Sequence, residues 1–293
     1  MRNELAKLIT QKTKENKNFF LVAGDAGLGL WDNYQKEFKE QYLNPGINEA
    51  ASIGLCAGLS LAGKKVLYYN ICNFTLMRPY EQVRNDICYQ ELPIILVGIG
   101  CGLTYAPCGM THYAIEDIAL ALTCPNLQIF SPCDSLEVKT CFEYAYKSQN
   151  PSYIRIAKSG EEKLHTKDID DISSFQLLKN ASKDILLISH STLTSEVIKA
   201  ANELNASVIS IPFINSTNEK IKEFIKTFKH VFVVEEHFKY GGLGTFLKAK
   251  LELPLKQIAL KDKYIHEIGN QNFIRKHYGL DYESLIKTIK EQI

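Results

Sequence analysis

The residues best suited to chemistry lie in three segments of the first half of the chain. Glu49 begins an apolar run, Phe74 opens the segment 73–86, and His112 lies within the Gly-containing segment 100–117. Each segment lies near the end of a strand-like run, where parallel sheets build their sites. A buried carboxyl such as Glu49 often has a chemical role. The plainer interpretations are a helix-dipole contact for Glu49 and a structural hydrogen bond for His112.

Small residues recur at every fourth position behind Glu49. Ala50, Gly54, Gly58 and Ala62 would therefore line one face of a helix. A face without bulk allows another backbone to approach closely. It suits either an interface with a second subunit or packing inside the core.

Length and composition indicate a two-domain globular protein. The chain has 293 residues, 45% of them hydrophobic and 23% charged. Its net charge of +1, from 34 basic and 33 acidic residues, gives no reason to expect a nucleic-acid or membrane surface. No signal peptide or long apolar run is evident, so we expect a cytoplasmic protein. The eight cysteines lack C-x-x-C spacing, which favours reduced, buried thiols without disulfides or a zinc site.

Strand-like and helical runs alternate along the chain, which predicts parallel α/β domains. Apolar strands without alternation imply burial on both faces. We expect a first domain at 1–160, a polar linker at 161–182 and a smaller α/β domain at 183–293. The predicted strands are Phe19–Gly24, Val66–Ile71, Ile94–Gly100, Leu127–Phe130, Tyr153–Ala157, Ile185–Ser189, Ser207–Ile211, Val231–Val234 and Gln257–Leu260. The predicted helices are 2–16, Glu49–Ala62, Pro79–Gln90, Tyr113–Thr123, Ser135–Ser148, Ser195–Leu204, Glu219–Phe228 and Gly241–Leu251.

Ordered motif blocks carry a family resemblance over nearly the whole chain. The blocks are Pro-Gly-Ile-Asn-Glu at 45–49, Arg-Pro-Tyr-Glu-Gln-Val-Arg-Asn at 78–85, Gly-Met-Thr-His at 109–112, Val-Glu-Glu-His at 234–237 and Gly-Gly-Leu-Gly at 241–244. The chain resembles the C-terminal half of transketolase. It is also similar to 1-deoxyxylulose-5-phosphate synthase and to the beta subunits of 2-oxoacid dehydrogenases. The resemblance implies a thiamine-diphosphate-binding fold followed by the transketolase C-terminal domain.

The resemblance also implies a cofactor and roles for individual residues. The cofactor would be thiamine diphosphate, with Glu49 hydrogen-bonded to N1′ of its aminopyrimidine and acting in an acid–base relay. Phe74 would stack on the pyrimidine, and His112 would lie near its amino group. Three further positions match residues at the cofactor or the subunit boundary: Asp25, Ile47 and Ile71.

Departures from the family pattern concern the substrate. Cys108 stands where transketolases carry an aspartate that touches a donor hydroxyl, and Gly100 stands where they typically carry a histidine. Lys158 replaces a phosphate-binding arginine, and Gly29 lies near the position of its assisting serine. Arg2 matches a second phosphate arginine. We therefore expect retained thiamine chemistry on a substrate other than the standard pentose phosphate pair.

The magnesium-binding motif of the family, Gly-Asp-Gly followed by an Asn, is not matched: Gly-Asp-Ala at 24–26 is the nearest approach. A partner subunit would then hold the diphosphate and Mg²⁺, with two copies of each chain, and this chain would hold no metal. The leading hypothesis is a split transketolase subunit that moves a two-carbon ketol unit between sugar substrates. The alternatives are a beta subunit for 2-oxoacid decarboxylation or synthase chemistry and a non-catalytic stabilising subunit.

Overall fold

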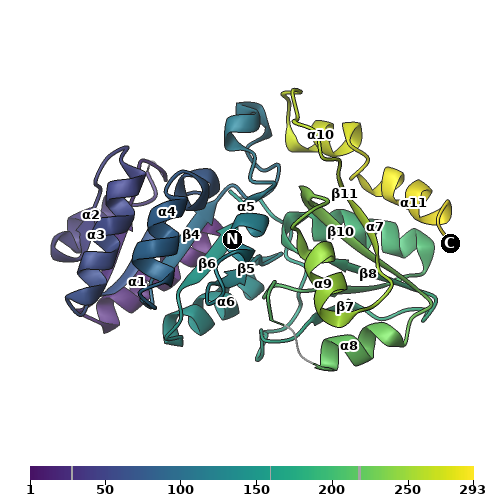
Figure 1. Ribbon diagram of the computed structural model, residues 1–293, viewed down its shortest axis with the longest axis horizontal. Coiled ribbons are helices and arrows are strands. Elements are labelled where there is room, and N and C mark those ends of the chain that lie inside the picture. Colours follow the sequence, from purple (N-terminus) through teal and green to yellow (C-terminus); the bar gives the residue numbers. More distant parts are fainter. Residues whose placement is uncertain (28, 159, 217–218) are drawn as a thin grey trace.

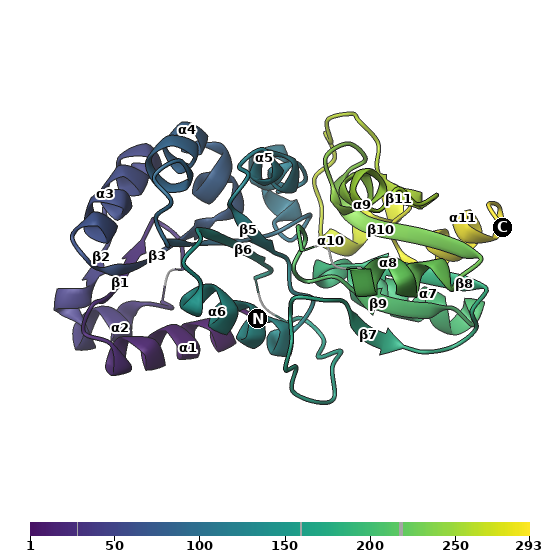
Figure 2. The ribbon, with the colours of Figure 1, turned by 60° about the horizontal axis from the view of Figure 1, so that its bottom comes forward.

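The computed structural model describes residues 1–27, 29–158, 160–216 and 219–293, which form two sheet-centred domains (Figure 1). The first domain runs from purple to teal and the second from green to yellow. Figure 2 shows the two sheets in succession, with helices above and below the first. The architecture confirms the predicted α/β fold class.

The first sheet is parallel throughout the described residues. Its strand order is β2-β1-β3-β4-β6-β5. Along β3, successive side chains enter opposite cores, as a parallel strand covered on both faces requires. The strands are β1 Phe19–Ala23, β2 Tyr42–Leu43, β3 Lys65–Ile71, β4 Ile95–Ile99, β5 Gln128–Phe130 and β6 Ser152–Ile156.

Helices cover both faces of this sheet. Apolar residues of α1 and α6 fill one core, and those of α3 and α5 fill the other. Asp134 accepts hydrogen bonds from the first backbone N–H groups of α6, so a side-chain cap fixes where that helix begins. The helices are α1 Arg2–Glu15, α2 Asp32–Glu37, α3 Glu49–Leu61, α4 Tyr80–Gln82, α5 Asp117–Leu122 and α6 Ser135–Lys147, with short 3₁₀ turns η1 Lys39–Gln41, η4 Ala106–Cys108 and η5 Met110–His112.

Two predicted helices of the first domain differ from the structure. The segment predicted as Pro79–Gln90 is mostly wider, π-helical backbone in η3 Val83–Cys88, and a second π segment, η2 Asn73–Met77, precedes it. The helix predicted from Tyr113 begins only at Asp117. Residue Ala114 is instead paired with Gly102 through two backbone hydrogen bonds of 3.0 Å, which hold the chain extended.

The second domain contains a mixed sheet in the order β11-β10-β8-β9-β7, in which only β7 is antiparallel to its neighbour among the described residues. Helices α7 and α11 pack on one face, and α8 and α9 on the other. Its elements are β7 Gln176–Lys179, β8 Ile185–Ser189, β9 Ser207–Ser210, β10 His230–Phe238 and β11 Lys256–Leu260, with the 3₁₀ turn η6 Ser191–Leu193 and helices α7 Thr194–Leu204, α8 Glu219–Lys226, α9 Leu243–Leu251, α10 Gln271–His277 and α11 Tyr282–Lys290.

Three elements of the second half correct the sequence prediction. Strand β7 lies inside the expected linker 161–182, and it pairs with β9. Its burial is only partial, because it lies at the sheet edge, so no apolar run marks it in the sequence. Helices α10 and α11 were not predicted either.

The structure also bears on membrane-spanning helices and on the burial of the cysteines. No helix in the described part of the chain is long and apolar enough to cross a membrane. Seven of the eight cysteines are buried as expected, but Cys108 is exposed in η4.

Candidate active site

Glu49 is the first residue of α3 and is buried, with 6% of its surface exposed. Its Oε1 accepts a hydrogen bond of 2.7 Å from Nη1 of Arg78. The expectation that Glu49 begins an apolar run is therefore incomplete, because this carboxylate has a cationic partner. The Arg78 side chain is half exposed, so solvent reaches one side of the pair.

An aromatic ring lies beneath the same arginine. The guanidinium carbon of Arg78 is 4.1 Å from the ring centre of Phe74, in cation–π geometry. The Phe74 ring in turn meets His112 edge-on, with ring centres 5.4 Å apart. The structure thus brings together Glu49, Phe74 and His112, as the sequence predicted, with Arg78 between the acid and the ring.

Backbone contacts hold His112 in place. Asn73 Nδ2 donates to the carbonyls of Thr111 and Tyr113, at 3.1 and 3.0 Å, which ties η2 to the loop on both sides of the histidine. The Thr111 hydroxyl lies 2.9 Å from Nδ1 of His112. His112 stands in the 3₁₀ turn η5 rather than at a helix start. Its Nε2 is therefore the nitrogen left for a ligand.

Tyr105 marks a second, cationic edge of the site. Its ring lies 6.1 Å from that of His112 and 5.8 Å from Nζ of Lys158. The charge of Arg2 also reaches the Tyr105 phenol. Burial raises the pKa of Tyr105 and keeps the phenol neutral.

The same tyrosine explains Gly100. A Cβ at Gly100 would lie 2.0 Å from the Tyr105 ring, and the backbone there has a φ of +89°, which favours glycine. A histidine at this position would clash with Tyr105. Gly100 therefore fits here because the Tyr105 ring fills the space that a side chain at position 100 would occupy.

Other expected site residues are less engaged. Asp25 and Cys108 are exposed, and Ile47 is 73% exposed, so these side chains are open to solvent. Ile71 is half-buried at the end of β3. Sequence reasoning assigned no role to Arg78 or Tyr105, although both lie in segments that carry the family motifs.

A buried polar network supports the loop that carries His112. Arg155 donates from Nε and Nη2 to the Asp117 carboxylate, at 2.7 and 3.0 Å, and both side chains are fully buried. Tyr153 donates to the same carboxylate at 2.8 Å. Arg155 also donates to the carbonyl of Ala114, so the pair fixes the extended segment that follows His112.

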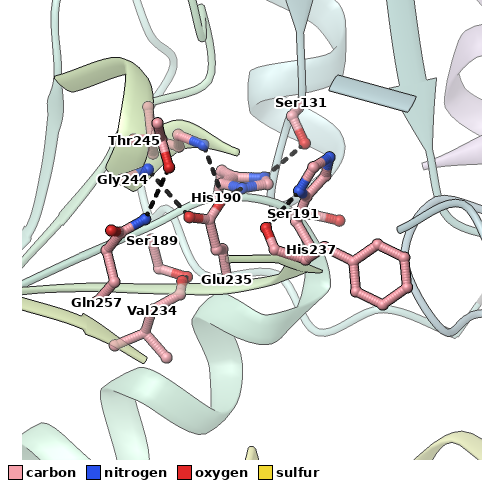
Figure 3. A network of polar contacts seen from close by, with 12 residues as sticks. Ser131, Ser189, His190, Ser191, Val234, Glu235, His237, Gly244, Thr245 and Gln257 are labelled. Atoms are coloured by element: carbon pink, nitrogen blue, oxygen red, sulfur yellow. Dashed lines mark hydrogen bonds and ion pairs between the residues drawn. The ribbon is translucent and has the colours of Figure 1, made fainter. Parts of the chain in front are cut away.

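This network continues into the second domain (Figure 3). The Ser131 hydroxyl lies 2.8 Å from Nδ1 of His190, and Nε2 of that histidine faces Glu235 at 3.6 Å. Glu235 accepts hydrogen bonds from the backbone N–H groups of Leu243 and Gly244 and thereby caps α9. Burial lowers the pKa of His190, which keeps its ring neutral.

The next glutamate ties the loop that carries His112 to the second domain. Glu236 accepts a hydrogen bond of 3.2 Å from the backbone N–H of Leu103 and is ion-paired with Arg275. A Cβ at Gly102 would collide with the Glu236 carboxylate. Within the motif at 234–237, Glu236 therefore positions the loop.

The donor set suits a planar heteroaromatic ligand. The Glu49 carboxylate and the Phe74 face together already hold one planar, nitrogen-bearing group, the Arg78 guanidinium. An aminopyrimidine offers the same two features, a flat face and a ring nitrogen that pairs with a carboxyl. Glu49 and Phe74 fit such a ring once the Arg78 side chain moves away from them.

Comparison with known proteins identifies both domains. Residues 1–160 match the transketolase pyrimidine-binding domain, and residues 176–293 match the transketolase C-terminal domain. The chain is 30% identical to a subunit of the apulose-4-phosphate transketolase of Actinobacillus succinogenes, over 86% of this chain and 84% of that one. It is 26% identical to the corresponding protein of Phocaeicola vulgatus, over 99% and 96%.

Solved structures agree. A split-gene transketolase, described as an inactive beta4 tetramer, superposes with a TM-score of 0.87 at 25% identity, covering 99% of this chain and 96% of that one. The transketolase of Campylobacter jejuni shares the fold with a TM-score of 0.85 at 17% identity, over 99% of this chain and 46% of that longer one. From its pyrimidine-binding domain to its C-terminal domain, the chain belongs to the transketolase family.

Proposed function

We propose that this chain is the C-terminal subunit of a split transketolase, which uses thiamine diphosphate to transfer a two-carbon ketol unit between sugar phosphates. The observation that carries the proposal is the convergence of Glu49, Phe74 and His112 at one edge of the first sheet. Relatives that are named as transketolase subunits support it, because they have about the same length as this chain.

Thiamine diphosphate supplies the carbanion and the electron sink that break and remake a bond next to a carbonyl. Glu49 would hold the N1′ nitrogen of its pyrimidine and carry a proton there. Phe74 would support the pyrimidine face in an offset stack. His112, fixed through Nδ1 and its flanking carbonyls, would present Nε2 to the reacting groups and donate or accept a proton there.

The cationic edge suits the phosphate end of a substrate. Lys158 and Arg2 both approach Tyr105, beside His112. Lysine binds phosphate as a point charge, and arginine adds a fork of donors. The Tyr105 ring fills the space that a side chain at position 100 would occupy. It would therefore shape the space between the phosphate and the reacting carbon.

A partner subunit would bring the diphosphate and Mg²⁺ site. The small-residue face of α3 supports this, because Ala50, Gly58 and Ala62 are exposed, which rules out burial in the core of this chain. Leu61 next to this face is 72% exposed. The related beta4 tetramer is described as inactive, as expected of a subunit without its partner.

The proposal is tested by mixing the chain with a diphosphate-binding partner, thiamine diphosphate and Mg²⁺, and by measuring ketol transfer from a ketose phosphate to an aldose phosphate. Glu49→Gln should lower kcat by about 10²–10⁴-fold, the range of a lost acid–base group. The matched control is Glu81→Gln, an exposed glutamate in nearby α4, which should leave the rate unchanged.

Other outcomes separate the alternatives. CO₂ release from a 2-oxoacid without ketose cleavage would identify a decarboxylase or synthase subunit. Calorimetry showing no cofactor binding by the assembled complex would identify a non-catalytic subunit. Full activity of Glu49→Gln would refute the role of Glu49.

A further inference from the structure

Away from the proposed active site, Cys133, Glu137 and His165 bring three potential ligand atoms within 4.8 Å of one another. Cys133 immediately precedes the residue that caps α6, Glu137 lies in the first turn of that helix, and His165 lies in the segment that follows β6. We propose that these three side chains bind a zinc-type divalent cation. This site is independent of the proposed cofactor and of the Mg²⁺ on a partner.

Glu137 is buried with one carboxylate oxygen unused. Its Oε2 accepts a hydrogen bond of 2.7 Å from the backbone N–H of Cys133, which fixes the side chain. Its Oε1 has no hydrogen-bond partner among the described residues, although the side chain is fully buried. An uncompensated buried carboxylate oxygen is costly, and a bound cation would remove that cost.

His165 is oriented as a metal-binding histidine is. Its Nδ1 lies 3.0 Å from Oδ2 of Asp134, and that oxygen also accepts the backbone N–H groups of Leu164 and His165. Since this oxygen already accepts two backbone N–H groups, Nδ1 donates to it as well, and Nε2 faces the cluster. Such carboxylate–histidine pairs commonly support metal ligands.

The spacing of the histidine nitrogen and the glutamate oxygen suits tetrahedral coordination. His165 Nε2 and Glu137 Oε1 are 3.6 Å apart, too far for a hydrogen bond. Two ligand atoms about 2.0–2.1 Å from zinc in a tetrahedron are roughly 3.4 Å apart, so a small adjustment admits the ion. A thiolate and an imidazole favour zinc over Mg²⁺ or Ca²⁺, which prefer oxygen ligands.

A cavity adjoins the cluster at Cys133. Cys133 and Leu164 both line a cavity of about 260 Å³ between the two domains. Ser210 of β9 lies close enough to affect the pKa of both Cys133 and Glu137, but it satisfies hydrogen-bond geometry with neither. A water molecule or this hydroxyl would complete the coordination.

A metal-free interpretation competes with the proposal. His165 could serve as an imidazolium between two carboxylates, because Asp134 and Glu137 together raise its pKa against the effect of burial. That interpretation leaves Glu137 Oε1 and His165 Nε2 without a hydrogen bond.

The test is titration of the EDTA-treated full chain with Co²⁺ alone, followed by absorption. One equivalent should bind with tetrahedral ligand-field bands and a sulfur-to-cobalt charge-transfer band, and Zn²⁺ should displace it. Cys133→Ser should abolish the charge-transfer band. Asp134→Asn should weaken binding about 10- to 100-fold, as expected for a residue that orients a ligand.

Control variants separate this site from other thiols and imidazoles. Cys108→Ser removes the exposed cysteine, and His277→Gln removes a half-exposed histidine that faces Glu267. Both should bind cobalt as the parent does. Circular dichroism checks that each variant is folded. A charge-transfer band that persists in folded Cys133→Ser, or no stoichiometric binding by the parent, would overturn the proposal. Neither result bears on ketol transfer.

Discussion

The Glu49–Arg78 and Asp117–Arg155 pairs combine the same two chemical groups in different surroundings. Arg155 and Asp117 are fully buried and joined by two hydrogen bonds, and Tyr153 donates to the same carboxylate. Arg78 is half exposed and donates one hydrogen bond to Glu49. The buried pair is part of the fold, whereas the other leaves a carboxylate and an aromatic face available once one arginine moves.

The reason is the penalty of desolvation. Removing one partner from a buried pair leaves a charge without water or counter-charge. An exposed arginine is solvated whether or not it is paired, so its ion pair contributes little to stability. A site in which a ligand must replace a protein contact needs the second, partly exposed kind of ion pair.

The largest expected effect is at the buried pair. Asp117→Asn should lower the free energy of unfolding by about 3–5 kcal/mol, because Arg155 would keep a buried, uncompensated charge. Urea denaturation followed by circular dichroism measures the loss. The double variant Asp117→Leu with Arg155→Met should recover much of the stability. Equal losses in the single and double variants would show that packing, not charge, dominates there.

A smaller effect is expected at Glu116, beside the buried pair. Burial and the charge of Asp117 raise the pKa of Glu116 to about 7, from an ordinary value of 4.5. Between these values the folded chain retains a proton that the unfolded chain has released, so stability falls as pH rises through this window.

Glu116→Gln removes this penalty. The variant should be more stable than the parent at pH 8, by about 1–2 kcal/mol after allowance for partial exposure, and similar to it near pH 4. Thermal unfolding at both pH values measures the difference, with Glu81→Gln as the exposed control. A stability difference independent of pH would contradict the titration.

The smallest effect on stability is expected at Arg78. Arg78→Met should change the free energy of unfolding by less than about 1 kcal/mol, because the arginine is half exposed and its removal opens the Glu49 carboxylate to water. In the reconstituted complex, calorimetry should show cofactor binding up to about fivefold tighter, since no ion pair then has to be broken. Weaker binding would instead make Arg78 a ligand of the cofactor.

Much of the fold could be predicted from local patterns. The strands that contain apolar runs lie within a few residues of their predicted bounds. The same is true of helices α3 and α6. Elements that lack a local signal were missed: β7 pairs at an edge, and α10 and α11 follow a polar stretch. The prediction that a helix begins at Tyr113 was wrong, because the pairing of Ala114 with Gly102 outweighs helical propensity there.

Sequence alone determined the family, the fold class and the meeting of Glu49, Phe74 and His112, because ordered motifs at the ends of parallel strands converge on one edge. Tertiary structure alone decided that Arg78 pairs with Glu49, that Tyr105 fills the space over Gly100, and that His165 faces Glu137. These contacts join side chains from different elements, and no spacing within one element encodes them. Their energies depend on burial and on the direction of each side chain, which only the folded chain defines.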